Sequence, residues 1–196
     1  MPLTYTNRKG VTYTLCRTTT KTGKGRYVFV RDPADRETVE EIPEGWEIRE
    51  SVNGVVSLAQ AREQQLRPEE IAAVKAALNA HPKAHNYRLD VKPERLLIYE
   101  RVGPDAEALL KAVSADGSVE VPPDLQQRLH DEVERYGRFT PILRFILNDA
   151  ETRDFRAERW CFRHHIDDRI FVDSGELTDL AETLIPTLGT DTFFDL

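Results

Sequence analysis

The sequence predicts an α+β protein of antiparallel hairpins and packed helices, with a small β-rich module at its N-terminal end. Three observations lead to this prediction. Segments in which apolar and polar residues alternate come in neighbouring pairs, most of them joined by a short turn rich in Gly, Asn or Pro. Segments with helical periodicity fall between these pairs, an order typical of α+β chains and not of doubly wound parallel folds. No repeat of fixed period is present.

Residues 1–60 are predicted to form the β-rich module. Gly10 and Gly54 each close a compact turn that needs a positive φ, and the pair Asn53-Gly54 is a strong hairpin signal. A polar loop at 18–23 and a turn at 42–45 separate the remaining segments. The expected strands lie at 3–6, 11–16 and 26–30, and from Trp46 onward.

Residues 61–196 are predicted to form an α+β domain with hairpins near 86–101 and 141–163. Pro68 suits the first position of a helix, and Pro82 ends that helix. Gly137 is expected to follow another helix as its C′ residue. The expected helices span 68–81, 105–113, 125–136 and 177–184, with a turn at Asp116-Gly117 and a short strand at 170–172.

Composition excludes several classes of protein. Charged residues make up 31% of the chain and no apolar run reaches the length of a membrane span, so no membrane partner is expected. The opening MPLTYTNRKG lacks the apolar core of a secretory signal, which predicts a cytoplasmic protein. Cys16 and Cys161 are too far apart and too few for a disulfide framework or a zinc site, and are expected to be buried thiols.

The common compact catalytic motifs are absent. The sequence has no phosphate-binding loop, no dinucleotide fingerprint after a strand, no serine elbow and no C-x-x-C pair. Thr22-Gly23-Lys24-Gly25 is predicted to be a turn, because no strand-to-helix transition surrounds it. The sequence therefore indicates no cofactor, and it favours a non-enzymatic binding or accessory protein over an enzyme.

Charge is distributed unevenly along the chain. Residues 1–31 hold seven basic residues and no acidic one, whereas residues 32–50 hold eight acidic and two basic residues. Basic turns around an aromatic-bearing sheet are how small β domains bind phosphates while bases stack on rings. This pattern predicts nucleic-acid binding through Arg8, Lys9, Arg17, Lys21, Lys24, Arg26 and Tyr27. One alternative is that the aromatic residues form the core of the module and the basic residues solvate its loops. Another is that the basic hairpin pairs with the acidic stretch 32–50 of the same chain.

Three strings in this region also carry a resemblance: TNRKG at 6–10, TKTGKGRYVF at 20–29 and EIPEGWEI at 41–48. They resemble the opening of a family of uncharacterised prokaryotic proteins with TNRKG, TKTGKxRYxF and EIPEGxEI blocks. Trp46 stands where that family usually has tyrosine. The resemblance implies a recurring β module and carries over no catalytic residue.

A second candidate site is the string His164-His165-Ile166-Asp167-Asp168, which follows a predicted strand. Imidazole and carboxylate groups at a strand end can bind a divalent metal or transfer protons, which would indicate a metal-dependent hydrolase or nuclease. Successive residues of an extended chain point to opposite faces, however, and no helical ligand spacing accompanies them. A solvated polar loop is the competing interpretation and the favoured one.

Two further features concern anions and protein partners. From residue 112 onward the chain has nine arginines, no lysine and eighteen acidic residues. The last predicted hairpin carries the set Arg144, Arg153, Arg156, Arg159 and Arg163. Arg159 and Arg163, on the face that carries Cys161, could line a phosphate pocket, but the favoured interpretation is that the arginines pair internally with carboxylates. The acidic faces and the C-terminal tail, with Phe193 and Phe194 beside acidic residues, indicate a structural subunit that docks onto a protein partner, unless the tail packs on its own domain.

Overall fold

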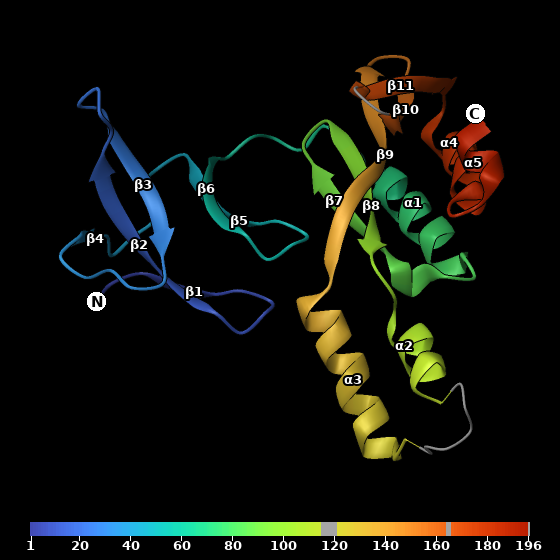
Figure 1. Ribbon diagram of the computed structural model, residues 1–196. Helices are drawn as coiled ribbons and strands as arrows, with labels where there is room; N and C mark the ends of the chain where they lie inside the picture. Colours follow the sequence, from blue (N-terminus) through green and yellow to red (C-terminus); the bar gives the residue numbers. More distant parts are fainter. Residues whose placement is uncertain (115–120, 164–165, 196) are drawn as a thin grey trace. The chain divides into compact units, whose positions relative to one another are not determined.

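The computed structural model describes residues 1–114, 121–163 and 166–195, without the side chains of residues 162, 163, 166 and 167. The fold is α+β, as predicted, and every strand pair in the described chain is antiparallel. Figure 1 shows the helices and strands of the chain. The chain divides into two compact units. Unit 1 comprises Met1–Arg62 and Ala106–Gly137, and unit 2 comprises Glu63–Asp105 and Arg138–Leu196.

The N-terminal part of unit 1 contains a sheet centred on β2 (Thr12–Thr19). One edge of β2 pairs with β3 (Gly25–Val30), and the other pairs first with β1 (Thr4–Thr6) and then with the short β4 (Glu37–Thr38). Five of the eight residues of β2 are Thr or Tyr, which favour strands. Leu15 and Cys16 in β2 are completely buried.

A separate hairpin of β5 (Trp46–Glu50) and β6 (Val56–Gln60) completes this module. Gly10 and Gly54 both have a φ of +77°, which confirms the two predicted turns. The buried Asn7 joins these turns, because its side-chain amide donates a 2.6 Å hydrogen bond to the Gly54 carbonyl. The module is therefore held together by a polar link between two turns as well as by its core.

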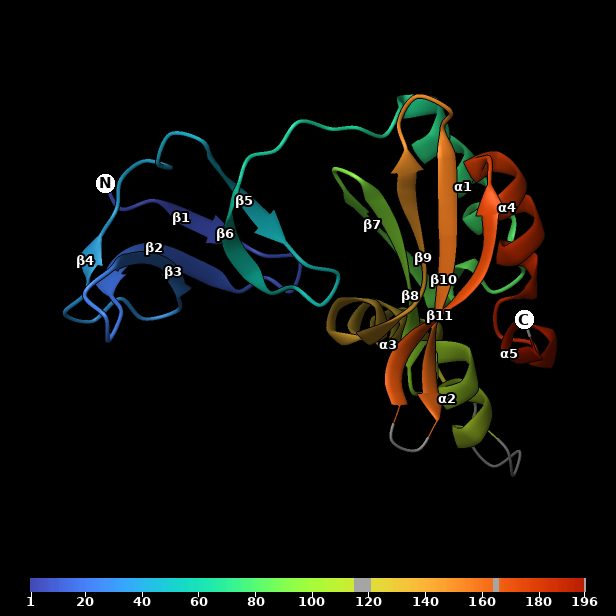
Figure 2. The ribbon, with the colours of Figure 1, turned by 90° about the horizontal axis from the view of Figure 1, so that it is seen from above.

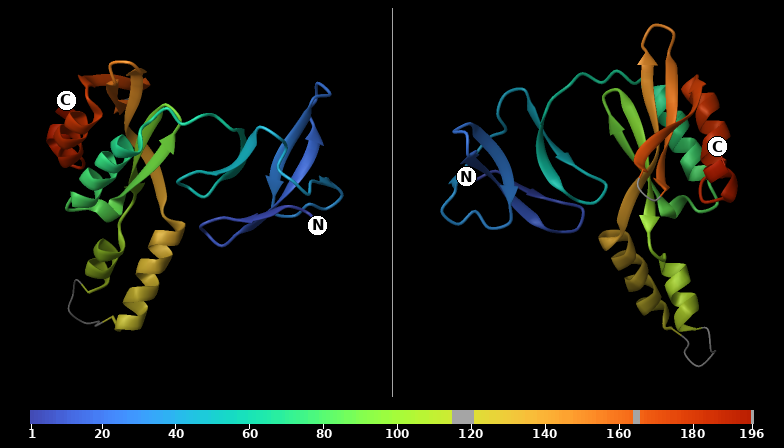
Figure 3. Two further views of the ribbon diagram at one scale, coloured as in Figure 1. Left: turned by 180° about the vertical axis from the view of Figure 1, so that it is seen from behind. Right: turned by 45° about the horizontal axis from the view of Figure 1, so that its top comes forward.

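The second part of unit 1 is a pair of helices, α2 (Ala106–Val113) and α3 (Pro123–Tyr136), which lie side by side (Figure 3). Gly137 follows α3 with a φ of −48°, so the prediction of a left-handed C′ glycine is wrong. Its amide still donates to the Val133 carbonyl and closes the helix without that conformation. The predicted turn at Asp116-Gly117 lies outside the described residues.

Unit 2 is built on a five-stranded sheet in which sequence neighbours are also spatial neighbours (Figure 2). The strands β7 to β11 are joined by hairpins except between β8 and β9. There the segment containing α2 and α3 leaves the sheet at Val102 and returns at Arg138, and these two residues are direct cross-strand partners. The strands are β7 (Tyr87–Lys92), β8 (Arg95–Val102), β9 (Arg138–Asp149), β10 (Asp154–Arg163) and β11 (Ile166–Gly175).

A helical layer covers one face of this sheet (Figures 2 and 3). It contains α1 (Pro68–Ala80), α4 (Leu177–Leu184), α5 (Asp191–Asp195) and the 3-10 turns η1 (Ala84–Asn86) and η2 (Ile185–Thr187). Val74, Leu180 and Leu184 from the helices meet Ile98 and Phe145 from the strands in one buried cluster. Because the helices occupy only this face, the side chains that alternate with the core residues point to the other side.

Two further outcomes concern single predictions. β11 is ten residues long, so the predicted three-residue strand at 170–172 is far too short. Cys16 and Cys161 are both free and buried, as predicted. None of the described helices is both long and apolar enough to cross a lipid bilayer.

Candidate nucleic-acid interface

The predicted basic residues of the N-terminal module fall into two groups at opposite ends of β2. Arg8 and Lys9 lie in the turn before β2, and Lys21 and Lys24 lie in the turn after it. β2 has eight residues, and at about 3.3 Å per residue the two turns are separated by roughly 26 Å. One small ligand cannot contact both groups, so the predicted site has to be divided.

Arg17 belongs to the second group and lies on the same face as Tyr27. The two residues are direct cross-strand partners in β2 and β3, and such partners point to one side of a sheet. Gly25 leaves room for the arginine, because a Cβ at this position would lie 3.6 Å from Arg17 Nε. The guanidinium therefore extends over the start of β3, toward the turn that carries Lys21 and Lys24.

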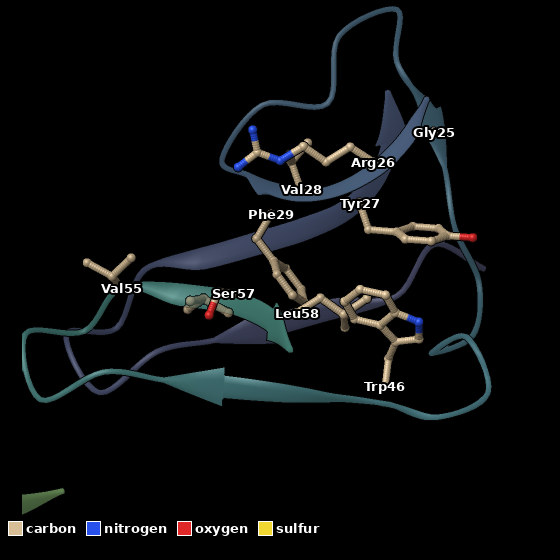
Figure 4. A pocket seen from close by; sticks show the side chains of 10 residues that line it. Gly25, Arg26, Tyr27, Val28, Phe29, Trp46, Val55, Ser57 and Leu58 are labelled. Atoms are coloured by element: carbon tan, nitrogen blue, oxygen red, sulfur yellow. The ribbon is translucent and has the colours of Figure 1, made fainter. Parts of the chain in front are cut away.

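Next to Tyr27 lies a hollow of about 520 Å³ between β3 and the β5–β6 hairpin. Figure 4 shows the side chains of Tyr27, Phe29, Trp46 and Leu58 facing one another across it. The ring centroids of Tyr27 and Trp46 are 6.4 Å apart, with their planes inclined at 59°. Trp46 remains 37% exposed, so this aromatic pair has apolar ring surface available to a ligand.

Arg26, a further residue predicted for the site, lies on the other face of β3. Figure 4 shows its side chain, together with that of Val28, on the opposite side of β3 from Tyr27 and Phe29. This follows from strand alternation, which sends Arg26 to the same face as its cross-strand partner Thr18. Arg26 can contribute charge near the turn but does not share the aromatic face.

Internal pairing with the acidic stretch accounts for only part of the basic charge. Arg17 Nη1 lies 3.9 Å from Glu37 Oε1, with both side chains more than half exposed, which makes this ion pair weak. The carboxylate of Glu47 pairs with Arg49 instead, with 2.5 Å between Arg49 Nε and Glu47 Oε1. Within the described part of the chain, Lys21, Lys24 and Arg26 form no ion pair with a carboxylate.

Trp46 was not among the residues predicted for this site. It begins β5 within the acidic stretch, nineteen positions after Tyr27, and only the fold brings the two rings together. The nearest sequence signal was the position of Trp46 at the start of an alternating strand, which does not specify a partner.

The predicted metal site lies largely outside the described residues. This applies to His164 and His165 and to the side chain of Asp167. Asp168 is exposed, and its carboxylate accepts a 2.7 Å hydrogen bond from the amide of Arg169. Among the described residues no three metal-ligating side chains gather into one group. The metal-dependent hydrolase or nuclease stays a prediction.

The C-terminal tail forms α5 and is anchored through one of its two phenylalanines. Phe193 is buried in the core of unit 2, whereas Phe194 is 52% exposed. The two rings pack edge to face with centroids 5.5 Å apart, and Arg159 donates a hydrogen bond to the Phe194 carbonyl. The tail thus packs on its own unit through Phe193, and docking of a protein partner on the tail or the acidic faces stays a prediction.

Comparison with known proteins adds no functional assignment. Neither a protein-family model nor a curated protein nor a solved structure matches this chain.

Proposed function

We propose that this chain is a non-enzymatic nucleic-acid-binding protein whose N-terminal module holds a single strand. Bases stack on the Tyr27–Trp46 pair, and the neighbouring phosphates contact Arg17 and the turn that carries Lys21 and Lys24. The observation that carries the proposal is the exposed aromatic pair beside a hollow, with three basic side chains at the same end of the module.

A single strand fits this arrangement better than a duplex does. Proteins that bind single strands combine aromatic rings, on which unstacked bases lie, with a basic surface that follows the backbone. In a duplex the base faces are already stacked on one another, so Tyr27 and Trp46 would find only base edges and phosphates. The hollow's volume also lies within the range of about 300–1,000 Å³ typical of ligand-binding pockets.

Fluorescence anisotropy with labelled single-stranded DNA and RNA oligonucleotides tests the proposal. Replacement of Trp46 or Tyr27 by Ala should weaken binding by about 5- to 150-fold, since stacking contributes about 1–3 kcal/mol per base. Neutralising both lysines in Lys21→Gln/Lys24→Gln should lower the slope of log K against log salt by about 1.4, because each phosphate contact to a single strand contributes about 0.7.

Arg8→Gln/Lys9→Gln is the matched control, because it removes the same charge from the far end of the same module. It should leave the affinity and the salt slope nearly unchanged. A duplex of equal length should bind more weakly than the single strand. Equal losses from the two double variants would refute the division of the site, and absence of oligonucleotide binding at low salt would refute the function.

A further inference from the structure

The five-stranded sheet of unit 2 carries a cluster of arginines on the face opposite its hydrophobic core. Arg144 in β9 is the cross-strand partner of Leu97 in β8 and of Glu158 in β10, so these side chains share one face. The same alternation places Arg95 in β8 and Arg156 in β10 on this face. Arg169 in β11 joins them as the partner of Trp160 in β10.

Glu158 is the carboxylate that pairs with two members of this cluster, Arg144 and Arg156. Glu158 is 5% exposed and accepts a 2.6 Å hydrogen bond from Arg144 Nε while it also forms an ion pair with Arg156. In the described chain neither Arg95 nor Arg169 forms an ion pair with a carboxylate. These four guanidinium groups and Glu158 together carry a net charge of +3, in a chain whose net charge is −7. Asp90 in β7 shares this face as the partner of Leu97, and its carboxylate lies 3.1 Å from the Lys92 ammonium.

Unused donors are also present. The Nε of Arg95 is buried and finds no hydrogen-bond partner among the described residues. A buried donor without a partner is unfavourable, because it has lost its water without replacing it. A ligand oxygen at this position would remove that cost.

The positive charges lie close enough to affect one another. Burial, together with the neighbouring Arg144 and Arg95, lowers the pKa of Arg169, although Glu158 opposes this shift. The Arg169 guanidinium lies over the Trp160 ring, 4.7 Å from its centroid, which holds the charge in place. Burial and Asp90 raise the pKa of Tyr99, so its hydroxyl stays protonated near neutral pH and can donate.

We infer that this face binds a phosphate group, with Arg95 and Arg169 as its main ligands and Arg144 and Tyr99 beside them. Guanidinium forks from different strands supply more donors than the two oxygens of one carboxylate can accept, whereas a phosphate offers three or four acceptor oxygens. The site lies in unit 2 and shares no residue with the proposed nucleic-acid site of unit 1.

The two tryptophans of the chain allow this site to be observed separately. In the full chain carrying Trp46→Phe, Trp160 is the sole tryptophan and lies against Arg169. Its emission should change saturably when inorganic phosphate, pyrophosphate, a nucleoside triphosphate or a single-stranded oligonucleotide is added at constant ionic strength. A response to all four probes identifies the phosphate group alone as the determinant. Response only to the triphosphate or only to the oligonucleotide assigns the phosphate to a nucleotide or to a phosphodiester chain.

The double variant Arg95→Gln/Arg169→Gln should lower the affinity for the most tightly bound probe by about tenfold or more. This is the loss expected for a charge-assisted hydrogen bond. Lys75→Gln/Lys83→Gln removes the same charge from exposed positions outside the strands and should have no effect. Circular dichroism establishes that each variant is folded. If the glutamine variant unfolds, Arg95→Lys/Arg169→Lys replaces it, since lysine keeps the charge but loses the fork and should also weaken binding.

Three results would overturn the inference. The first is no change in Trp160 emission with any probe up to about 1 mM, the weakest affinity expected of a specific site. The others are an affinity in the arginine variants equal to that of the chain with both arginines, or binding of a polyglutamate peptide as tight as that of the phosphate probes. The nucleic-acid proposal is judged independently in the Trp160→Phe chain, where Trp46 is the reporter. If the oligonucleotide changes Trp46 emission and none of the four probes changes Trp160 emission, the phosphate site fails and the nucleic-acid site stands. If a probe changes Trp160 emission and the oligonucleotide leaves Trp46 emission unchanged, the phosphate site stands and the nucleic-acid site fails.

Discussion

At the scale of single residues, Glu70 connects the first turn of α1 to the turn between β9 and β10. Its carboxylate accepts hydrogen bonds from Arg153 Nε at 2.8 Å and from the Arg67 amide at 2.7 Å, and both members of the ion pair are largely buried. Burial raises the pKa of Glu70, but the bonds from Arg153 and Arg67 outweigh it and hold the pKa below its ordinary value. The contact therefore stabilises the fold when Glu70 is ionised.

Glu70→Gln should lower the free energy of unfolding by about 2 kcal/mol at pH 7, the range for hydrogen bonds to charged groups. Because the folded-state pKa is lowered, this stabilisation is fully present above about pH 4.3, the ordinary glutamate value, and is lost as the pH falls through the folded-state pKa. Urea unfolding at several pH values measures it. Glu69→Gln, an exposed neighbour in the same turn, should leave both stability and its pH dependence unchanged.

Gly189 and Gly103 form a natural pair for a second test in unit 2. Both have a positive φ, +71° and +88°, but a Cβ on Gly189 would lie 2.8 Å from Tyr87 Oη, whereas a Cβ on Gly103 would meet nothing within 4 Å. Gly103→Ala should cost about 1–2 kcal/mol for its backbone conformation. Gly189→Ala should cost about 1–3 kcal/mol more, because it also overpacks Tyr87. Thermal unfolding compares them, and equal costs would refute the steric argument.

At the scale of elements, Asn7 determines how the β1–β2 turn meets the β5–β6 hairpin. Its side-chain oxygen accepts from the amides of Lys9 and Val11, at 3.0 and 2.9 Å, and so shapes its own turn. Its side-chain amide donates to Gly54 and so connects the second turn. Since the hairpin supplies Trp46 and Leu58 to the hollow, this bond helps to form the candidate interface.

Asn7→Ala should destabilise the module by about 3 kcal/mol, since three hydrogen bonds of about 1 kcal/mol each are lost. Asn7→Asp separates the two roles, because its oxygens still accept from Lys9 and Val11 but cannot donate to Gly54. The aspartate variant should therefore keep the β1–β2 turn while amide hydrogen exchange in β6 accelerates. Unchanged exchange at Leu58 in both variants would show that the hairpin does not depend on Asn7.

Most elements were predictable from the sequence because their signals are local. Alternation and turn residues predicted β3 and the Asn53-Gly54 turn, and Pro68 marked the first residue of α1. The predicted strand is shorter than β11 because the string around Asp167 and Asp168 is typical of a polar loop, whereas pairing with nine residues of β10 extends the strand. Gly137 shows the opposite error, in which a local signal predicted a conformation that the entry into β9 does not require.

The candidate sites were less predictable, because they are assembled across strands. The basic and aromatic composition indicated the N-terminal module, and Arg17 and Tyr27 do lie on one face. No spacing rule relates Tyr27 to Trp46. The arginine set shows the same limit. Arg144 and Arg156 pair internally, as favoured, but Arg95 and Arg169 lie on different strands, and only the fold brings them to one face.

At the scale of the whole molecule, the charge is segregated rather than balanced. A chain with a net charge of −7 presents basic side chains at the β2–β3 turn of unit 1 and on the sheet of unit 2. The remaining surface repels polyanions and should slow their approach at low salt, whereas the two proposed sites should attract them. The sign of the overall charge is therefore a poor guide to what each unit binds.

The connection between β8 and β9 offers a test of how independent unit 2 is. Val102 and Arg138 are cross-strand partners, so a two-residue Asn-Gly turn can replace residues 103–137 without moving either strand. The shortened chain should fold cooperatively, keep its strand content by circular dichroism and retain the Trp160 response. The shortened chain loses Asp105, whose carboxylate forms hydrogen bonds with His85 and Asn86. Its free energy of unfolding should therefore fall by about 1–2 kcal/mol. Loss of folding would show that the sheet needs the helical pair.

That connection also matters for the engineering of the chain. A β-meander whose strands pair in sequence order needs only a turn between β8 and β9, so we expect the sheet to form with or without the helical pair. Loop-closure entropy rises only slowly with length, and the two ends are already neighbours. We therefore expect that designed chains can carry a different insert between Val102 and Arg138 while the sheet stays the same.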